Sequence, residues 1–189
     1  MERVQLSEKV LELVQHGTKK WVGIAPFAAH EGKMYPLDLM EQVISQLSST
    51  NRILFFGGGD EEQNRLETWE KKFPNTVSIA GKITFSEELD LISNLDAMLA
   101  MDSGNAHLAS LFGVPTITLW GVTHPYTGFY PFGQDIENAL LADREKFSLI
   151  PTSVYGNKMP DGYSEAMRTI DPEAILRKIT IILEKEERK

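Results

Sequence analysis

The chain of 189 residues contains no cysteine. It therefore forms no disulfide, offers no thiol nucleophile or cysteine metal cluster, and carries no sign of an oxidising compartment. Long basic runs are also lacking, since 19 Lys and Arg residues stand against 27 Asp and Glu residues and give a formal net charge of −8. This balance argues against a nucleic-acid backbone or an anionic membrane surface as the main partner, but a few local donors suffice for a small anion.

Long apolar runs are absent as well. No stretch approaches the roughly 18 apolar residues of a membrane-spanning helix, and the charged, amphipathic start of the chain is unlike a signal peptide. We therefore expect no transmembrane segment and a cytoplasmic location. The length and the 42% hydrophobic content predict one domain with a full core.

Several common catalytic signatures are missing. The glycines at 57–59 follow a predicted strand, but neither G-x-G-x-x-G nor a G-K-[ST] ending is present. Ser103 lacks the G-x-S-x-G elbow of a hydrolase nucleophile, and the spacing of the four histidines does not predict a zinc site. The carboxylate pairs Glu61-Glu62 and Glu87-Glu88 stand at helix starts, where complementarity to the helix dipole explains them better than acid–base work.

Strands and helices are predicted to alternate along most of the chain. The predicted strands are 21–25, 51–56, 77–80, 97–101 and 116–120, and the predicted helices between them are 37–47, 63–72, 86–93 and 105–112. Each strand is apolar throughout, which is typical of a parallel sheet covered on both faces. We predict a doubly wound, Rossmann-like α/β domain with ligands at the carboxyl ends of its strands.

The two ends of the chain differ from this pattern. Residues 1–18 are predicted to form an N-terminal helix or a connector, with Ser7 as a candidate cap, and the domain is predicted to span 19–189. Within it, 125–163 is rich in Gly, Pro and aromatic residues and is predicted to be loop-rich with a short strand near 138–141. Pro172 behind Asp171 predicts the start of a last helix that extends to 187.

The turn at 102–104 is the best candidate for a binding site. Asp102 or Ser103 can cap the following helix, Gly104 allows a ligand close to the backbone, and the first N–H groups of the helix favour an anion such as phosphate. His107, about one turn further, faces the same space. From spacing alone, an anion site and a purely structural reading, with Asp102 as a cap and His107 half-buried, have equal weight.

Lys33 presents the same two alternatives. It lies in a loop of small residues at the end of a predicted strand, from which its ammonium can reach a phosphate at the 102–104 turn. A solvated surface lysine explains the residue equally well.

Taken together, these stretches resemble the glycosyltransferase family 9 heptosyltransferases, in their C-terminal, nucleotide-sugar-binding half. The matching stretches are Ile-Ala-Pro-Phe-Ala-Ala at 24–29 with Lys-Met-Tyr-Pro at 33–36, Phe-Gly-Gly-Gly-Asp-Glu-Glu at 56–62, Ala-Gly-Lys-Ile at 80–83, Met-Asp-Ser-Gly-Asn-Ala-His-Leu-Ala at 101–109 and Leu-Trp-Gly-Val-Thr-His-Pro at 119–125. The Asp-Ser-Gly-x-x-His-Leu motif, followed at the right distance by a strand that ends in Gly-Val-Thr, is the specific part.

The resemblance implies the C-terminal lobe of a two-lobed (GT-B) enzyme that is inverting and independent of metal. Such an enzyme transfers a heptose from an ADP-activated donor to the growing lipopolysaccharide core. By position, Lys33 would pair with the phosphates, and Asp102, Ser103, Gly104 and His107 would form the diphosphate site through the backbone amides at 103 and 104 and the imidazole of His107. Glu61 or Glu62 would bind the ribose, and the backbone around Lys82 and Ile83 would flank the base.

The chain departs from the family in two places. Where relatives often carry Asn-Pro-Gly or hydroxyl residues, it has Pro-Phe-Ala-Ala at 26–29, so phosphate contacts there would come from backbone N–H groups. The N-terminal lobe, which carries the acceptor surface and the carboxylate expected as general base, has no counterpart. We therefore expect a donor-binding domain that is inactive by itself and needs no cofactor, in the cytoplasm or at the inner face of the inner membrane. The alternative is a non-catalytic binding or interaction module, or one half of a split enzyme.

Overall fold

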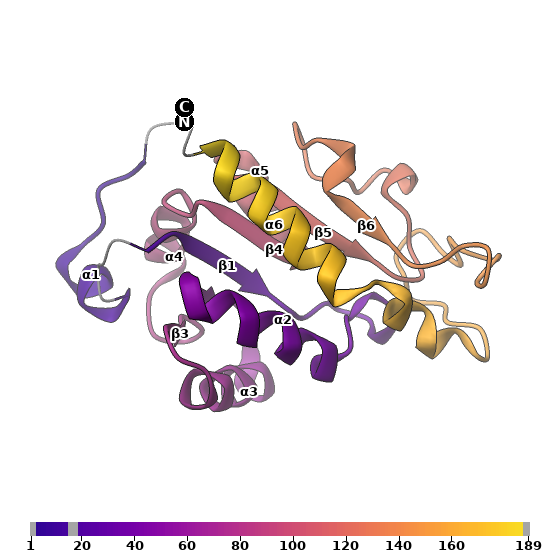
Figure 1. The fold of residues 1–189 in the computed structure, drawn as a ribbon, viewed down its shortest axis with the longest axis horizontal. Coiled ribbons are helices and arrows are strands. Elements are labelled where there is room, and N and C mark those ends of the chain that lie inside the picture. The colour runs from indigo at the N-terminus through magenta and orange to yellow at the C-terminus, as the bar shows by residue number, and fades with distance from the viewer. Residues whose placement is uncertain (1–2, 15–18, 187–189) are drawn as a thin grey trace.

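The structure is a computed structural model that describes residues 3–14 and 19–186. Its centre is a six-stranded, fully parallel sheet in the order β3-β2-β1-β4-β5-β6 (Figure 1). The strands are β1 (Trp21–Ala25), β2 (Arg52–Phe55), β3 (Thr76–Ser78), β4 (Ala97–Met101), β5 (Thr116–Trp120) and β6 (Ala139–Leu141). The helices are α1 (Glu8–Val14), α2 (Leu37–Thr50), α3 (Gly59–Lys72), α4 (Phe85–Ile92), α5 (Gly104–Leu111) and α6 (Pro172–Glu186).

Helices cover both faces of the sheet, and alternate strand residues supply the two cores. Along β4, Leu99 and Met101 belong to the core beneath α2, α3 and α6, while Met98 and Ala100 belong to the core beneath α1, α4 and α5. Figure 1 shows α2 and α6 side by side across one face of the sheet. Because both faces are buried, the strands are mostly apolar on both sides, and Thr116 and Thr118 of β5 are small hydroxyl residues that are buried as well. The predicted doubly wound α/β fold is confirmed.

Three strands, β1, β4 and β5, have the predicted bounds, because they end before Pro26, Asp102 and Gly121, respectively. The largest difference is at α3, which begins at Gly59 rather than at residue 63. The glycines suggested a longer turn, but Asp60, Glu61 and Glu62 occupy the first helical turn, where acidic side chains favour the helix dipole. The predicted connection at 16–18 and residue 187 lie outside the described residues.

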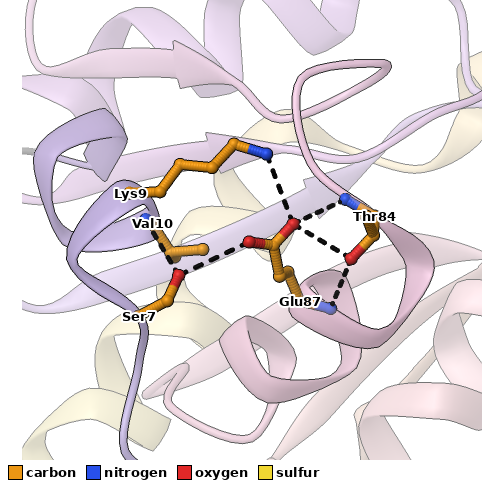
Figure 2. A network of polar contacts seen from close by, with 5 residues as sticks. All are labelled: Ser7, Lys9, Val10, Thr84 and Glu87. Atoms are coloured by element: carbon orange, nitrogen blue, oxygen red, sulfur yellow. Dashed lines mark hydrogen bonds and ion pairs between the residues drawn. The ribbon is translucent and has the colours of Figure 1, made fainter.

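The N-terminal segment packs on the domain. Val10 and Val14 of α1 are buried in the core beneath α4 and α5. Ser7 caps α1, as predicted, by accepting a hydrogen bond from the Val10 amide, and its hydroxyl also donates to Glu87. Glu87 in turn binds Lys9 and closes a capping box with Thr84 at the start of α4 (Figure 2). One carboxylate therefore joins the N-terminal segment to α4.

Candidate functional site

β1 and β4 are neighbours in the middle of the sheet, and the strand order reverses between them. β2 and β3 follow outward from β1, and β5 and β6 follow outward from β4 on the opposite side. In such sheets, the crevice beyond the carboxyl ends of these two strands is the usual ligand site. The loop after β1 brings Lys33 to this place, and the turn after β4 brings Asp102, Ser103 and Gly104. Two of the predicted stretches thus meet at the switch point.

The turn after β4 opens α5 with free backbone donors. Ser103 is the N-cap residue, with φ −149° and ψ 170°, but its side chain accepts no capping hydrogen bond. Its Oγ is buried and has no hydrogen-bond partner among the described residues. Gly104 is exposed, and a Cβ placed on it would have no atom within 4 Å. The start of α5 therefore presents N–H groups, which helices leave unpaired in their first turn, to an open space.

Asp102 does not cap α5, so this part of the sequence interpretation was wrong. Its carboxylate points instead to Lys33, whose Nζ lies 2.9 Å from Oδ2, and to Thr123, whose hydroxyl donates to the same oxygen at 2.9 Å. The side chains of Lys33 and Asp102 are only 13% and 5% exposed. Lys33 is thus neither a solvated surface lysine nor a free cation, because it forms a nearly buried ion pair at the switch point.

Glycines allow the surrounding loops to approach closely. A Cβ on Gly121 would collide with the carbonyl oxygen of Gly32, and that oxygen accepts a hydrogen bond from the Val122 amide at 3.0 Å. A Cβ on Gly156 would lie 2.6 Å from Cδ of Lys33. The loops after β1 and β5 and the segment around residue 156 are therefore packed together around the lysine.

Glu61 and Glu62 lie in the first turn of α3, beyond the carboxyl end of β2. Glu62 accepts a hydrogen bond from the Gly58 amide at 2.8 Å, and the carboxylate of Glu61 has no partner among the described residues. Both residues line a cavity of about 630 Å³, together with Phe27, Ala28, Glu31, Met34, Tyr35, Pro36, Leu37, Arg65, Ser164, Glu165 and Arg168. The predicted ribose carboxylates thus border a cavity that continues from the loop after β1.

The remaining predicted residues lie on both sides of the switch point. Lys82, after β3, pairs with Glu70 at 2.8 Å, and Ile83 packs against the core beneath α4. Their side chains are therefore engaged, which leaves backbone groups for the role predicted there. His107 lies in α5 and is half-buried, and its ring has no hydrogen-bond partner in the described part of the chain. A ring N–H of this side chain is therefore available to a ligand.

Electrostatic surroundings set the charge of two further groups. Burial raises the pKa of the Tyr35 hydroxyl, which donates to the Ile170 carbonyl, so this side chain stays neutral and structural. Burial and the neighbouring Arg144 guanidinium lower the pKa of His124, whose Nδ1 accepts from the Tyr126 amide. A neutral His124 thus caps the turn after β5.

Sequence reasoning missed two residues of this cluster. Thr123 was quoted only as the end of the Gly-Val-Thr stretch, without a role, although its hydroxyl bonds to Asp102. Gly156 was one of many glycines in a loop-rich segment, and no local pattern distinguishes a glycine that packs against a distant lysine. Only the motif around Thr123 offered a signal.

A comparison with families of known proteins shows the family of the chain. The model described as "Glycosyltransferase family 9 (heptosyltransferase)" matches residues 3–156. The chain belongs to glycosyltransferase family 9. The membership predicted from the motifs is confirmed.

The relatives found are heptosyltransferases. The chain is 31% identical over 128 residues to lipooligosaccharide heptosyltransferase 2 of Haemophilus influenzae, a match that covers 67% of this chain and 34% of that protein. It is 24% identical over 176 residues to lipooligosaccharide heptosyltransferase 2 of Campylobacter jejuni, covering 90% of this chain and 53% of the relative. The chain therefore spans about half or less of the length of these relatives.

Solved structures share the fold. A family 9 glycosyltransferase from Veillonella parvula matches with a TM-score of 0.71 and 17% identity, over 96% of this chain and 53% of its own. An Escherichia coli heptosyltransferase in complex with ADP matches with a TM-score of 0.64 and 18% identity, over 89% of this chain and 46% of its own.

Among the described residues, no helix is long and apolar enough to span a membrane.

Proposed function

We propose that the chain is the donor-binding half of an inverting, metal-independent heptosyltransferase, with an ADP-activated heptose as donor and the lipopolysaccharide core as acceptor. The open start of α5 beside Lys33 carries the proposal, because it offers three kinds of donor to one anion. They are backbone N–H groups, the ammonium and the Ser103 hydroxyl, which has no partner among the described residues. Related structures solved with ADP and with ADP-2-deoxy-2-fluoro heptose support the class of ligand.

Each proposed contact follows from the chemistry of a diphosphate. The amides at Ser103 and Gly104 point to the phosphates together with the imidazole of His107, and the helix dipole of α5 favours their negative charge. Lys33, although paired with Asp102, has further ammonium protons to donate to a phosphate oxygen, and together with the N–H groups of α5 it takes the place of a metal ion. Glu61 and Glu62 accept from the ribose hydroxyls at the mouth of the neighbouring cavity.

The base of the nucleotide would lie beyond β3. There, Ile83 is half-buried against the core and Lys82 is held by Glu70, so the backbone of this turn is fixed as a wall for the adenine. We place the domain at 19–189, with residues 1–18 as the connection to a further lobe. That lobe would hold the general base and the acceptor surface, and the whole enzyme would work in the cytoplasm or at the inner face of the inner membrane.

A second candidate function is a binding module that completes a split enzyme. Exposed aromatic side chains favour it, since Tyr126 is 80% exposed and Phe132 is 82% exposed, and the ring of Tyr155 contacts that of Phe129 at the surface. Exposed apolar surface of this kind marks contact sites. Co-purification with a second polypeptide would favour this function, whereas a monodisperse lone chain would count against it.

Isothermal titration of the 189-residue chain with ADP, in the presence of EDTA, tests the first proposal. We expect one site per chain and the same affinity when Mg²⁺ replaces EDTA. UDP serves as the control nucleotide, with the same diphosphate and a different base. No heat of binding with ADP, or binding that appears only with Mg²⁺, would refute the proposal.

A further inference from the structure

The Lys33–Asp102 pair has a third member. Oδ2 of Asp102 forms an ion pair with Lys33 Nζ and accepts a hydrogen bond from the hydroxyl of Thr123, each at 2.9 Å. Thr123 is 1% exposed, so its hydroxyl has no access to bulk water. A carboxylate with two donors on one oxygen cannot rotate freely about its terminal bond, and the position of the ammonium is fixed with it.

The stem of Lys33 is fixed separately. Cγ and Cδ of the lysine lie against Gly156, where a Cβ would come within 2.7 and 2.6 Å of them. A Cβ at the same place would also lie 3.0 Å from Cγ2 of Thr123. Gly156 thus touches both the lysine stem and the threonine that holds its carboxylate partner.

The segment that carries Gly156 is itself anchored. The Thr152 amide donates to the Val122 carbonyl at 2.9 Å, and the Thr152 hydroxyl donates to the carbonyls of Val122 and Lys158. A Cβ on Gly32 would lie 3.5 Å from Sδ of Met159. The segment is therefore held to the loop after β5 and lies close to the loop after β1.

We propose that Thr123 and Gly156 are positioning residues for Lys33, which act on the bound diphosphate without touching it. The inference rests on the proposed function, in which Lys33 pairs with the phosphates. Thr123 holds the carboxylate of Asp102, which in turn holds the ammonium of Lys33. Gly156 leaves room for the methylene stem of Lys33 and packs against it. Fixing a lysine before binding avoids the loss of its considerable rotamer entropy when the phosphate arrives.

Ligands with different numbers of phosphates distinguish a positioning role of Thr123 and Gly156 from a general structural role. Lys33 acts on the phosphates alone, so a displaced lysine weakens ADP strongly and leaves adenosine unaffected. The test therefore compares the dissociation constants of ADP, AMP and adenosine for the full chain. A variant that merely loosens the fold would weaken all three ligands by the same factor.

Thr123→Val removes the hydroxyl and keeps the shape of the side chain, and Thr123→Ser keeps the hydroxyl. We expect Thr123→Val to bind ADP about tenfold more weakly, because the freed lysine side chain must then be ordered when ADP binds, with unchanged adenosine binding. Thr123→Ser should bind ADP within about twofold of the wild type. Wild-type ADP affinity in Thr123→Val, or an equal loss for adenosine, would overturn the role of Thr123.

Gly156→Ala has a matched control in Gly133→Ala. Both glycines have positive φ, 76° and 69°, but a Cβ on Gly133 would have no atom within 4 Å. The strain of a left-handed alanine is therefore shared, and only Gly156→Ala displaces Lys33. We expect weaker ADP binding in Gly156→Ala alone, and equal ADP affinities in the two variants would overturn the role of Gly156.

A measurement without ligand keeps this inference separate from the proposed function. In ¹⁵N NMR, a held ammonium exchanges its protons slowly, so the Nζ signal of Lys33 should be visible in the wild type and in Thr123→Ser but lost in Thr123→Val and Gly156→Ala. Equal Lys33 signals in all four proteins would refute the anchoring. If the signals change as expected but the wild type binds no ADP, the proposed function fails and only the fixing of the lysine stands.

Discussion

Two buried aspartates lie at opposite ends of β4, and they do different work. Asp96 precedes the strand and is 8% exposed, and Asp102 follows it and is 5% exposed. Asp96 accepts from the Trp21 amide at 2.7 Å and from Arg3 at 2.7 Å, with Lys20 at 3.9 Å. Asp102 binds Lys33 and Thr123, both from other loops of the carboxyl edge.

The surroundings distinguish the two carboxylates better than their burial does. Arg3 is 60% exposed and belongs to the N-terminal segment, so Asp96 joins that segment to the start of β1. The pair at Asp102 is nearly buried, lies beside the open start of α5 and is packed against glycines. Both aspartates are thus buried and ion-paired, although Asp96 has a structural role and Asp102 lies in the candidate site. The two differ in that backbone N–H groups at the start of α5 lie next to Asp102.

Of the two aspartates, Asp96 has the structural role, and its removal should have the largest effect. Asp96→Ala leaves the buried Trp21 amide without this acceptor and Arg3 without its carboxylate, so we expect a loss of about 3 kcal/mol of stability. Urea unfolding measures it. The folded variant should bind ADP as the wild type does, because Asp96 lies at the other edge of the sheet.

Asp161→Ala is the control, since this exposed aspartate has no partner among the described residues. It should change stability by less than about 0.5 kcal/mol. A loss as small as this in Asp96→Ala would mean that Asp96 is not the joint described above.

Lys33→Ala tests the other side of the comparison. Loss of a charge-assisted hydrogen bond to phosphate should weaken ADP binding by about 2 kcal/mol. His107→Ala should act in the same direction, by about 1 to 3 kcal/mol. Lys72→Ala is the matched control, because Lys72 is also ion-paired, to Glu41 at 2.6 Å, but lies at the end of α3. Calorimetric titration gives the affinities of the wild type and the three variants. Equal ADP binding in all four proteins would mean that Lys33 and His107 have only structural roles.

Thr84→Ala probes the second joint of the N-terminal segment. The substitution removes the side-chain half of the capping box of α4, and we expect a loss of about 1 kcal/mol in the free energy of unfolding. Thr84→Ser should retain most of the stability, since serine caps equally well. Equal losses in the two variants would assign the effect to the methyl group instead of the cap.

Glu87 supplies the smallest effect, and it depends on pH. Hydrogen bonds from Thr84, first of all from its backbone, hold the pKa of the Glu87 carboxyl below its usual value of 4.5. A carboxyl with a lowered pKa stabilises the fold at pH values above its unfolded pKa, and this contribution disappears as the pH falls through the folded pKa. Unfolding curves of wild type and Glu87→Gln should therefore converge on acidification, and a constant difference between them from neutral pH to pH 3 would contradict this origin.

The sequence allowed the sheet to be predicted well, for a local reason. β4 is an apolar run that ends before Asp102, and β5 is a run rich in β-branched residues that ends before Gly121. Such runs need no distant contact to be recognised. The short 3₁₀ helix at Tyr163–Thr169 was not foreseen, because its residues show no clear periodicity and it is held by tertiary contacts. The early start of α3 was missed because its glycines are more typical of turns.

The candidate site could be predicted residue by residue but not as an arrangement. Lys33 and Asp102 were both expected near a ligand, whereas their ion pair depends on how the loops after β1 and β4 meet in space. Thr123 and Gly156 come from two further segments, so their contacts with this pair have no local signature. All assignments of ligand contacts remain predictions, namely those to Lys33, Glu61, Glu62, Lys82, Ile83, Asp102, Ser103, Gly104 and His107.

In the proposed function, the edge of the sheet at Asp102 receives the ligand and the edge at Asp96 does not. A ¹H–¹⁵N NMR titration of the whole chain with ADP tests this directly. We predict that the amide signals of Ser103, Gly104 and His107 shift together in a saturable way, while those of Trp21 and Asn94, beside Asp96, stay in place. Shifts confined to Trp21 and Asn94, or no shift at the start of α5, would contradict the claim.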